Sequence, residues 1–207
     1  METILKYFPE LTPRQREQLA VMERLYPEWN AKINVISRKD IDNLEVNHLL
    51  HSLAIAKFVQ WVPGTTVLDF GTGGGLPGLP LALYYPDVKF HLVDRTGKKL
   101  RVAQDIAQQC GLTNVTVQHG DVKEVKGTYD FVVSRAVMDL PDMVPLLRRL
   151  VSKQCRNSLP NGLICLKGGD LSGELKNFKK QVMVDDLSNW FSEPFFETKK
   201  VVYLPLV

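Results

Sequence analysis

Four of the five residues at positions 71–75 are glycine, and they directly follow the apolar run 66–70. Glycine has no Cβ, so it lets the backbone turn sharply and pass close to a ligand. When such a run is a strand of a parallel sheet, ligands bind at its carboxyl end, near the free N–H groups of the next helix. A tight strand-to-helix turn also uses glycine, but so dense a cluster predicts the binding site of an adenosine-containing cofactor.

Carboxylates follow the next two apolar runs. Asp94 ends the run 88–93, about 20 residues beyond the glycines, where an acidic residue accepts hydrogen bonds from both hydroxyls of a ribose. Asp121 and Val122 follow the run 115–118, where a carboxylate and a backbone N–H can read the edge of an adenine. Asp94 can instead cap the following helix, and the second segment can be a simple turn.

The segment 73–78 also matches the G-x-G-x-x-G fingerprint of dinucleotide-binding proteins. Pro77 and Pro80 argue against a dinucleotide, because proline lacks the N–H group that a pyrophosphate would use at the start of the helix. S-adenosylmethionine has no phosphate and needs space more than donors, so it is the favoured cofactor. A nicotinamide-dependent oxidoreductase is the alternative.

After residue 64, short apolar runs alternate with helical stretches. This alternation predicts a doubly wound α/β sheet of the Rossmann-like type, mostly parallel and covered by helices on both faces. The tail differs, because Phe195-Phe196 and residues 201–204 are expected to form an antiparallel strand pair that finishes the sheet. The expected parallel strands are 66–70, 88–93, 115–118, 131–134 and 163–167, and the expected helices are 78–85, 97–110, 139–155 and 171–184.

The region before the sheet is expected to be helical. Thr12 can cap a helix over residues 12–26, which Pro27 ends. Asp40 is expected to cap a second helical stretch that closes at the Pro-Gly turn of residues 63–64. The expected organisation is a helical extension packed on a cofactor-binding domain as one compact unit, with residues 1–64 in the extension and residues 65–207 in the domain.

The composition is that of an ordinary globular protein, with 26 Lys and Arg against 23 Asp and Glu, a net charge of +3. No apolar run reaches the roughly 18–20 residues of a membrane span, and the first residues lack a secretory pattern, so a cytoplasmic location without membrane contact is expected. The three cysteines form no CxxC pair, so no metal site is expected. A monomer is favoured, although the sequence leaves the oligomeric state open.

Four short motifs give the chain a family resemblance. They are Trp29-Asn30 with Ile33-Asn34, the segment DFGTGGGLPG at 69–78, Ser134-Arg135-Ala136, and Leu166-Lys167-Gly168. Over most of its length the sequence resembles the bacterial glucose-inhibited division protein B family. The resemblance implies a class I methyltransferase fold and an enzyme that transfers a methyl group from S-adenosylmethionine to guanine N7 in 16S ribosomal RNA. The implied partner is this RNA or the small ribosomal subunit.

The resemblance also implies which residues contact the cofactor, and Arg135 among them is expected to position the cofactor or the guanine. Its guanidinium can meet the O6 edge of that base, although a structural ion pair is the alternative. The expected cofactor-binding residues are the turn glycines Gly71, Gly73 and Gly75, together with Leu76, Asp94, Asp121, Val122 and Arg135.

Substrate contacts are expected on basic and polar residues around this site. Two departures from the family pattern affect them, because His51 stands where the family has Asp, and lysines stand near the end of the chain where members often have Arg. Single-stranded or looped RNA is the expected target, since a duplex buries its bases. The candidate substrate residues are Asn34, His48, Lys98, Lys99, Arg101, Lys167, Lys199 and Lys200.

Methylation of guanine N7 requires little acid–base chemistry from the protein. The N7 atom has a free lone pair and no proton, so the enzyme mainly aligns donor and acceptor for an in-line displacement. No residue is therefore assigned as a general base. A methyltransferase that acts on a small molecule or on a protein is the closest alternative, and a non-catalytic binding module is a further one.

Overall fold

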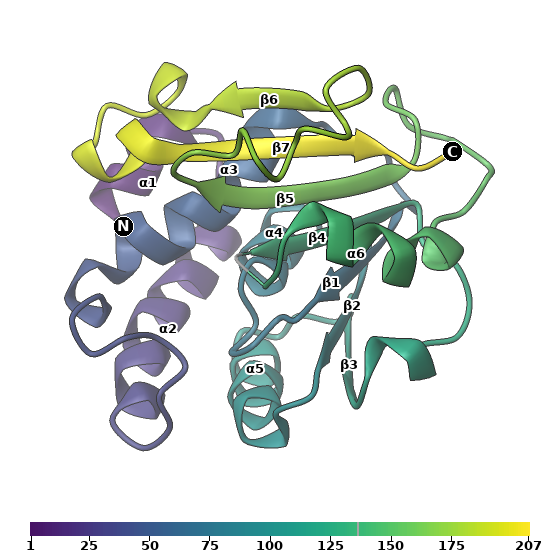
Figure 1. Ribbon diagram of the computed structural model, residues 1–207. Coiled ribbons are helices and arrows are strands. Elements are labelled where there is room, and N and C mark those ends of the chain that lie inside the picture. Colours follow the sequence, from purple (N-terminus) through teal and green to yellow (C-terminus); the bar gives the residue numbers. More distant parts are fainter. Residues whose placement is uncertain (136) are drawn as a thin grey trace.

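A seven-stranded sheet forms the centre of the protein in the computed structural model, which describes residues 1–135 and 137–207 (Figure 1). The strand order is β3-β2-β1-β4-β5-β7-β6, and every pair from β3 to β5 is parallel, whereas β7 runs antiparallel to both β5 and β6. The expected doubly wound, mostly parallel sheet with an antiparallel end is confirmed. The strands are β1 (Thr66–Phe70), β2 (Lys89–Asp94), β3 (Val115–His119), β4 (Phe131–Arg135), β5 (Gly162–Gly168), β6 (Met183–Asp186) and β7 (Lys199–Pro205).

Helices cover both faces of the sheet. One face packs against the amino-terminal helices together with α4 and α5, and the other packs against α6, which lies in front of the sheet in Figure 1. The helices are α1 (Glu2–Tyr7), α2 (Pro13–Asn30), α3 (His51–Phe58), α4 (Gly78–Tyr84), α5 (Gly97–Gln109) and α6 (Leu140–Leu147). Wider π-helical turns at Glu45–Leu50 lead into α3, and short 3₁₀ turns lie at Ile41–Asn43, Val122–Glu124, Arg148–Leu150, Leu187–Asn189 and Pro194–Thr198.

The amino-terminal residues share one apolar core with the sheet. Ile4, Tyr26 and Leu53 belong to the same buried cluster as Val67 and Phe131. Removing this much apolar surface from water stabilises the contact between the helices and the sheet. The division of the chain at residue 64 stays a prediction, because the core itself is continuous across that point.

Helix α2 begins as expected and ends later than expected. The Thr12 hydroxyl accepts a hydrogen bond from the Gln15 N–H, and the Gln15 side chain accepts one from the Thr12 N–H, which is a complete capping box. The helix nevertheless continues through Pro27 to Asn30, because residues beyond the proline have tertiary partners. The Trp29 indole donates to Asp105, and the Asn30 side chain accepts from two backbone N–H groups of the next loop.

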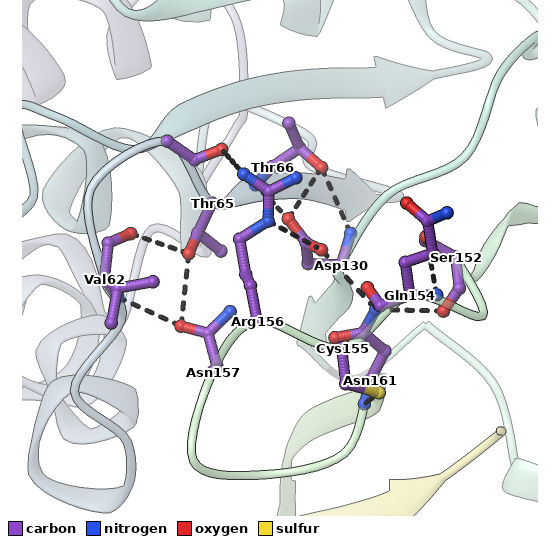
Figure 2. Close-up of polar contacts among 11 residues, drawn as sticks. Val62, Thr65, Thr66, Asp130, Ser152, Gln154, Cys155, Arg156, Asn157 and Asn161 are labelled. Atoms are coloured by element: carbon purple, nitrogen blue, oxygen red, sulfur yellow. Dashed lines mark hydrogen bonds and ion pairs between the residues drawn. The ribbon is translucent and has the colours of Figure 1, made fainter.

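The amino ends of β1 and β4 are joined by Asp130, which is 2% exposed. Its carboxylate accepts a 2.8 Å hydrogen bond from the Thr66 N–H, and its other oxygen faces the Asn161 amide and the Arg156 guanidinium (Figure 2). The Asn161 amide also donates to two carbonyls of the loop that precedes β5. This buried network aligns the three central strands at the end opposite to the glycine turn.

The carboxyl-terminal third corrects three sequence predictions. The expected helix 171–184 is absent from the described structure, where residues 172–181 form turns and the segment then becomes β6. Phe195-Phe196 lie in a 3₁₀ turn, so β6 and not this pair is the antiparallel partner of β7. Helix α6 ends at Leu147, well before residue 155, and Val151 forms a parallel bridge with Tyr129.

The first two of these corrections follow from the pairing of β7. Both of its edges form hydrogen bonds, to β5 on one side and to β6 on the other. Phe196 is fully buried against Phe191, so an aromatic pair that looked like a strand fills the core beneath this end of the sheet. Pairing between distant segments therefore overrode local propensity.

Replacing Gly162 with alanine is expected to destabilise the protein by about 1–3 kcal/mol, the usual cost of overpacking. A Cβ at Gly162 would lie 2.3 Å from the Leu204 carbonyl oxygen and 2.9 Å from the Pro205 Cα, both backbone atoms of the paired strand β7. Urea denaturation measures the change in unfolding free energy. Gly173→Ala is the matched control, because nothing lies within 4 Å of its Cβ position. Equal stability of the two variants would contradict the tight β5–β7 contact.

Candidate functional site

A cavity of about 250 Å³ opens at the carboxyl ends of β1 and β2, where the sequence predicts a ligand. Its wall brings together three of the predicted residues, Gly71, Asp94 and Val122. Most of the wall is apolar, and Asp94 contributes its carboxylate. The complete lining consists of Phe70, Gly71, Val93, Asp94, Arg95, Thr96, Gly120, Val122, Val137 and Met138.

The Asp94 carboxylate is held in place by the backbone on both sides of it. Oδ2 accepts a 2.9 Å hydrogen bond from the Gly73 N–H, and Oδ1 accepts a 2.7 Å hydrogen bond from the Thr96 N–H. Each oxygen keeps further acceptor capacity, since a carboxylate offers about four lone-pair sites. Asp94 is therefore a fixed, half-exposed acceptor at the edge of the cavity. The N-cap of α5 is Thr96, so the alternative role of Asp94 as that N-cap does not apply.

The glycine turn divides into residues that face the cavity and residues that face the core. Gly71 has φ of +69°, and a Cβ there would lie 2.6 Å from a methyl group of Val137, which forms part of the cavity wall. Gly75, with φ of +100°, packs against Leu79, and Leu76 is 4% exposed in the core. Among the described residues, the cavity wall includes none of Gly73, Gly75 and Leu76. Their assignment as cofactor contacts stays a prediction.

A fully buried carboxylate lies beneath the turn. Oδ2 of Asp69 accepts hydrogen bonds from the Thr72 hydroxyl at 2.6 Å and from the Gly78 N–H at 2.8 Å. Its other oxygen has no hydrogen-bond partner in the described part of the chain. Burial raises the pKa of Asp69 to about 7, although both hydrogen bonds act in the opposite direction. Gly78 has to be glycine, because a Cβ there would lie 2.6 Å from Oδ2 of Asp69.

Arg135 lies at the end of β4 and faces the amino-terminal helices. Its guanidinium donates to Nδ1 of His48 at 3.0 Å, and Nε2 of His48 lies 3.1 Å from the Asp40 carboxylate. Because arginine only donates, His48 accepts at Nδ1 and carries its proton at Nε2, which points to Asp40. Burial and the Arg135 charge lower the pKa of His48 to about 4, so the imidazole is neutral at pH 7.

The same region ties the helices to the glycine turn. The buried hydroxyl of Tyr26, in α2, donates to the Gly74 carbonyl at 3.0 Å.

Burial lowers the pKa of Arg135, while Tyr26, Asp69 and Asp40 raise it. Asp40, which was expected to cap a helix, makes no capping hydrogen bond and instead accepts from Asn47 and faces His48.

Asp121 is engaged with its own neighbours. It caps the 3₁₀ turn Val122–Glu124, accepts a hydrogen bond from the Lys123 N–H at 2.9 Å and forms an ion pair with Arg95. The Lys123 hydrogen bond and the Arg95 charge lower the pKa of Asp121. Among the described residues, the cavity wall contains Gly120 and Val122 and not Asp121. The adenine contact of Asp121 stays a prediction.

A second hollow of about 410 Å³ adjoins the first and shares Val137 and Met138 with it. Its wall contains the predicted residue Lys167, whose Nζ lies 2.6 Å from Glu174 in an ion pair with side chains only 8% and 9% exposed. Glu174 was missed from the sequence, because the expected helix 171–184 gave no reason to turn it toward the sheet. The lining is Val137, Met138, Asp139, Lys167, Gly168, Asp170, Leu171 and Glu174.

The other candidate substrate residues lie at several places on the surface. Lys98 and Arg101 are exposed on α5, and the Lys99 side chain passes 3.9 Å from the Cβ position of Gly73. Asn34 is exposed and lines a separate hollow of about 330 Å³ beside α2. The contacts of these residues with a substrate stay predictions, as do those of Lys199 and Lys200.

The two departures from the family pattern lie in one region. His51 is buried edge-on against Phe195 and Phe196. Burial lowers the pKa of His51 well below its usual range, so the imidazole that packs against these two rings is neutral. Nζ of Lys199 lies 4.7 Å from the centre of the Phe195 ring, and Lys200 is paired with Asp186. The Ser134-Arg135-Ala136 motif is described only to Arg135, since Ala136 lies outside the described residues.

The described residues contain no group of three or more His, Cys, Asp or Glu side chains placed to hold a metal ion. The same residues include no helix with the length and apolar character that crossing a membrane demands.

Known proteins identify the family. The sequence model described as rRNA small subunit methyltransferase G (GidB) matches residues 15–201. The chain belongs to this family. The resemblance to glucose-inhibited division protein B is thereby confirmed. Curated relatives named ribosomal RNA small subunit methyltransferase G include those of Bacteroides thetaiotaomicron, 58% identical over 98% of both chains, and Flavobacterium johnsoniae, 52% identical over 100% of this chain and 98% of that one.

Solved structures confirm the class I methyltransferase fold of this family member. The magnesium protoporphyrin IX methyltransferase of Synechocystis PCC 6803, solved with bound SAM, aligns with a TM-score of 0.61 at 16% identity. It covers 87% of this chain and 90% of its own. A precorrin-6y methyltransferase from Geobacter metallireducens aligns with a TM-score of 0.57 at 10% identity, over 84% and 92% of the two chains. At such identities the likeness concerns the fold alone.

Replacing Asp69 with asparagine is expected to change how stability depends on pH. The folded protein holds the Asp69 proton up to a pKa of about 7, against 3.8 ordinarily, so it binds more protons than the unfolded chain between these values. The contribution of Asp69 to the unfolding free energy of the wild type therefore falls as the pH rises from about 4 to about 7, and it is constant above pH 7. Asp69→Asn removes the contribution. Urea denaturation from pH 5 to pH 8 should show the variant gaining stability relative to wild type, and parallel profiles would contradict the raised pKa.

Proposed function

We propose that the protein transfers a methyl group from S-adenosylmethionine to N7 of a guanine in 16S ribosomal RNA. Membership in the rRNA small subunit methyltransferase G family supports the RNA substrate, and the choice of N7 follows the family resemblance. The structural observation that supports the cofactor best is the Asp94 carboxylate, fixed by the Gly73 and Thr96 N–H groups at the mouth of a largely apolar cavity.

The residues of this cavity fit the adenosine part of the cofactor. The fixed carboxylate of Asp94 suits a ribose diol, and the apolar side chains of Phe70, Val122 and Met138 suit a flat, uncharged base. Arg95, the cation among the described residues of the wall, forms an ion pair with Asp121, which offsets its charge toward an anionic ligand.

The start of α4 argues against a pyrophosphate and thus against a nicotinamide dinucleotide. Pro77 and Pro80 have no N–H. The Gly78 N–H donates to Asp69, and the Leu79 N–H donates to the Gly75 carbonyl at 2.7 Å. The donors that a phosphate would use at this helix terminus are therefore missing or already engaged, which favours a cofactor without phosphate.

The chemistry requires alignment more than proton transfer. The bound sulfonium supplies an activated methyl group, and guanine N7 supplies a lone pair with no proton to remove. The chain's task is to hold the two in line and keep water out, which can contribute roughly 7–11 kcal/mol at most. Arg135, a buried cation held by His48 at the end of β4, is assigned to positioning the cofactor or the guanine.

The substrate approaches from the face that contains the glycine turn. Lys98, Lys99 and Arg101 begin α5 beside Gly73 and are suited to RNA phosphates. The reacting base has to leave its stack to enter a cavity at the sheet edge, which favours a loop or single strand. We place the enzyme in the cytoplasm as a monomer, acting on the RNA or on the small subunit.

The decisive experiment is label transfer. The purified protein is incubated with labelled S-adenosylmethionine and with 16S RNA or small subunits from a strain that lacks the gene, and the product is mapped for N7-methylguanosine. One labelled guanosine is expected in RNA from the deletion strain, and none in RNA that is already modified. Absence of label from both RNA and subunits overturns the proposal, and label in a protein or small molecule supports the alternative.

Asp94→Asn is expected to weaken S-adenosylmethionine binding about 10-fold to 100-fold, the usual range for losing hydrogen bonds to a charged group. The amide nitrogen of the variant would face one of the N–H groups of Gly73 or Thr96, so the side chain would lose both charge and orientation. Isothermal calorimetry measures the affinity. Asp87→Asn, an exposed change before the other end of β2, is the control and should bind like wild type. Unchanged affinity in Asp94→Asn would refute the ribose assignment.

A further inference from the structure

The hollow beside the cofactor cavity contains a buried ion pair. Lys167 lies near the carboxyl end of β5 (Gly162–Gly168), and its Nζ lies 2.6 Å from Oε1 of Glu174, which comes from the turns after that strand. Both side chains are more than nine-tenths buried. Val137 and Met138 belong to the walls of both hollows, so the pair lies next to the cavity to which the cofactor is assigned.

The pair has unused hydrogen-bonding capacity. Oε1 of Glu174 pairs with the Lys167 ammonium and accepts a hydrogen bond from the Leu140 N–H at 2.8 Å, while no hydrogen bond to Oε2 occurs within the described residues. The Lys167 ammonium forms its ion pair with Glu174 and donates a hydrogen bond to the Met138 carbonyl at 2.6 Å, so part of its three-donor capacity stays unused. The wall therefore offers a cationic donor directly beside a carboxylate oxygen.

The charge of this hollow favours a ligand rich in N–H donors. Its wall contains three carboxylates, those of Asp139, Asp170 and Glu174, against the one cation Lys167. Nζ of Lys199 also lies near this wall, 3.3 Å from the Cβ position of Gly168, so three carboxylates face two cations, a balance that favours the N–H groups of a base edge over a phosphate. A buried ion pair also contributes little to the stability of the fold, because apolar residues of similar volume in its place often give equal stability. Its position beside the reaction site indicates a role in recognition.

We propose that Lys167 and Glu174 read the edge of the acceptor guanine formed by O6, N1 and N2. Lys167 donates to O6, and the free oxygen of Glu174 accepts from N1–H and the N2 amino group. This edge does not include N7, so the N7 lone pair is left to face the cofactor cavity. Adenine presents an amino group in place of O6 and an acceptor in place of N1–H. A donor would therefore face the Lys167 donor, and an acceptor would face the Glu174 oxygen. The inference rests on the proposed function and names how that site selects its base.

The test compares guanosine with inosine at the methylated position of 16S RNA, because inosine keeps O6, N1–H and N7 and lacks only the N2 amino group. Wild type is expected to prefer guanosine by about 10-fold to 100-fold in kcat/KM, the value of one hydrogen bond to a charged acceptor. Glu174→Gln keeps an oxygen for Lys167 and Leu140 but replaces the free carboxylate oxygen with an amide donor. Its kcat/KM for guanosine should fall by a similar factor, and its preference over inosine should nearly vanish.

Glu193→Gln is the matched control. The Glu193 carboxylate accepts hydrogen bonds from the Tyr7 hydroxyl and pairs with Lys6, outside both hollows. This variant should keep the wild-type preference for guanosine. Calorimetry with S-adenosylmethionine and a thermal melt on both variants separate a loss of base recognition from a loss of structure.

The outcomes distinguish the two proposals. A folded Glu174→Gln protein with normal cofactor affinity and an unchanged guanosine preference shows that the ion pair only anchors the turns to β5, and the inference is then wrong. If that variant does not fold, the wild-type protein decides, since equal kcat/KM on guanosine and inosine also overturns the inference. A wild-type protein that labels no ribosomal RNA overturns the proposed function itself.

Discussion

The buried carboxylate of Asp69 organises the end of the sheet on which the rest of the site depends. One of its oxygens binds both the hydroxyl of Thr72 inside the glycine turn and the N–H of Gly78 at the start of α4. The turn is thereby closed over the strand end, and the Gly73 N–H is directed at Asp94. The second oxygen has no hydrogen-bond partner among the described residues, so the carboxylate is costly to ionise and its pKa rises to about 7.

The amino-terminal helices complete this arrangement from the other side. The Tyr26 hydroxyl binds the Gly74 carbonyl, and His48 accepts from Arg135 across 87 residues of sequence. The neutral imidazole is oriented in turn by Asp40. These helices are consequently more than a cover for the apolar sheet, since they fix a buried cation beside the turn. The arrangement explains how a site that needs no general base can still depend on charged residues far apart in the chain.

Local chemistry made much of the fold predictable. Thr12 forms the expected capping box because that contact involves only neighbouring residues. The inner parallel strands β1, β4 and β5 were predictable because a strand buried on both faces requires a continuous apolar run. The tail was less predictable, because β7 has partners on both edges and Phe196 fills the core, and neither fact is encoded in the local pattern around it. The turns that stand in place of the expected helix 171–184 bring Glu174 to Lys167.

The sequence by itself determined the chemistry that is encoded over short spacings. The glycines at 71–75 follow a buried strand, Asp94 ends the next one, and the prolines at 77 and 80 remove phosphate donors, so the class of cofactor follows from residue types alone. Tertiary structure decided which of these residues face the cavity, how Arg135 is held and where Glu174 lies. Such contacts join segments whose approach depends on the packing of the whole core, and no local propensity specifies it.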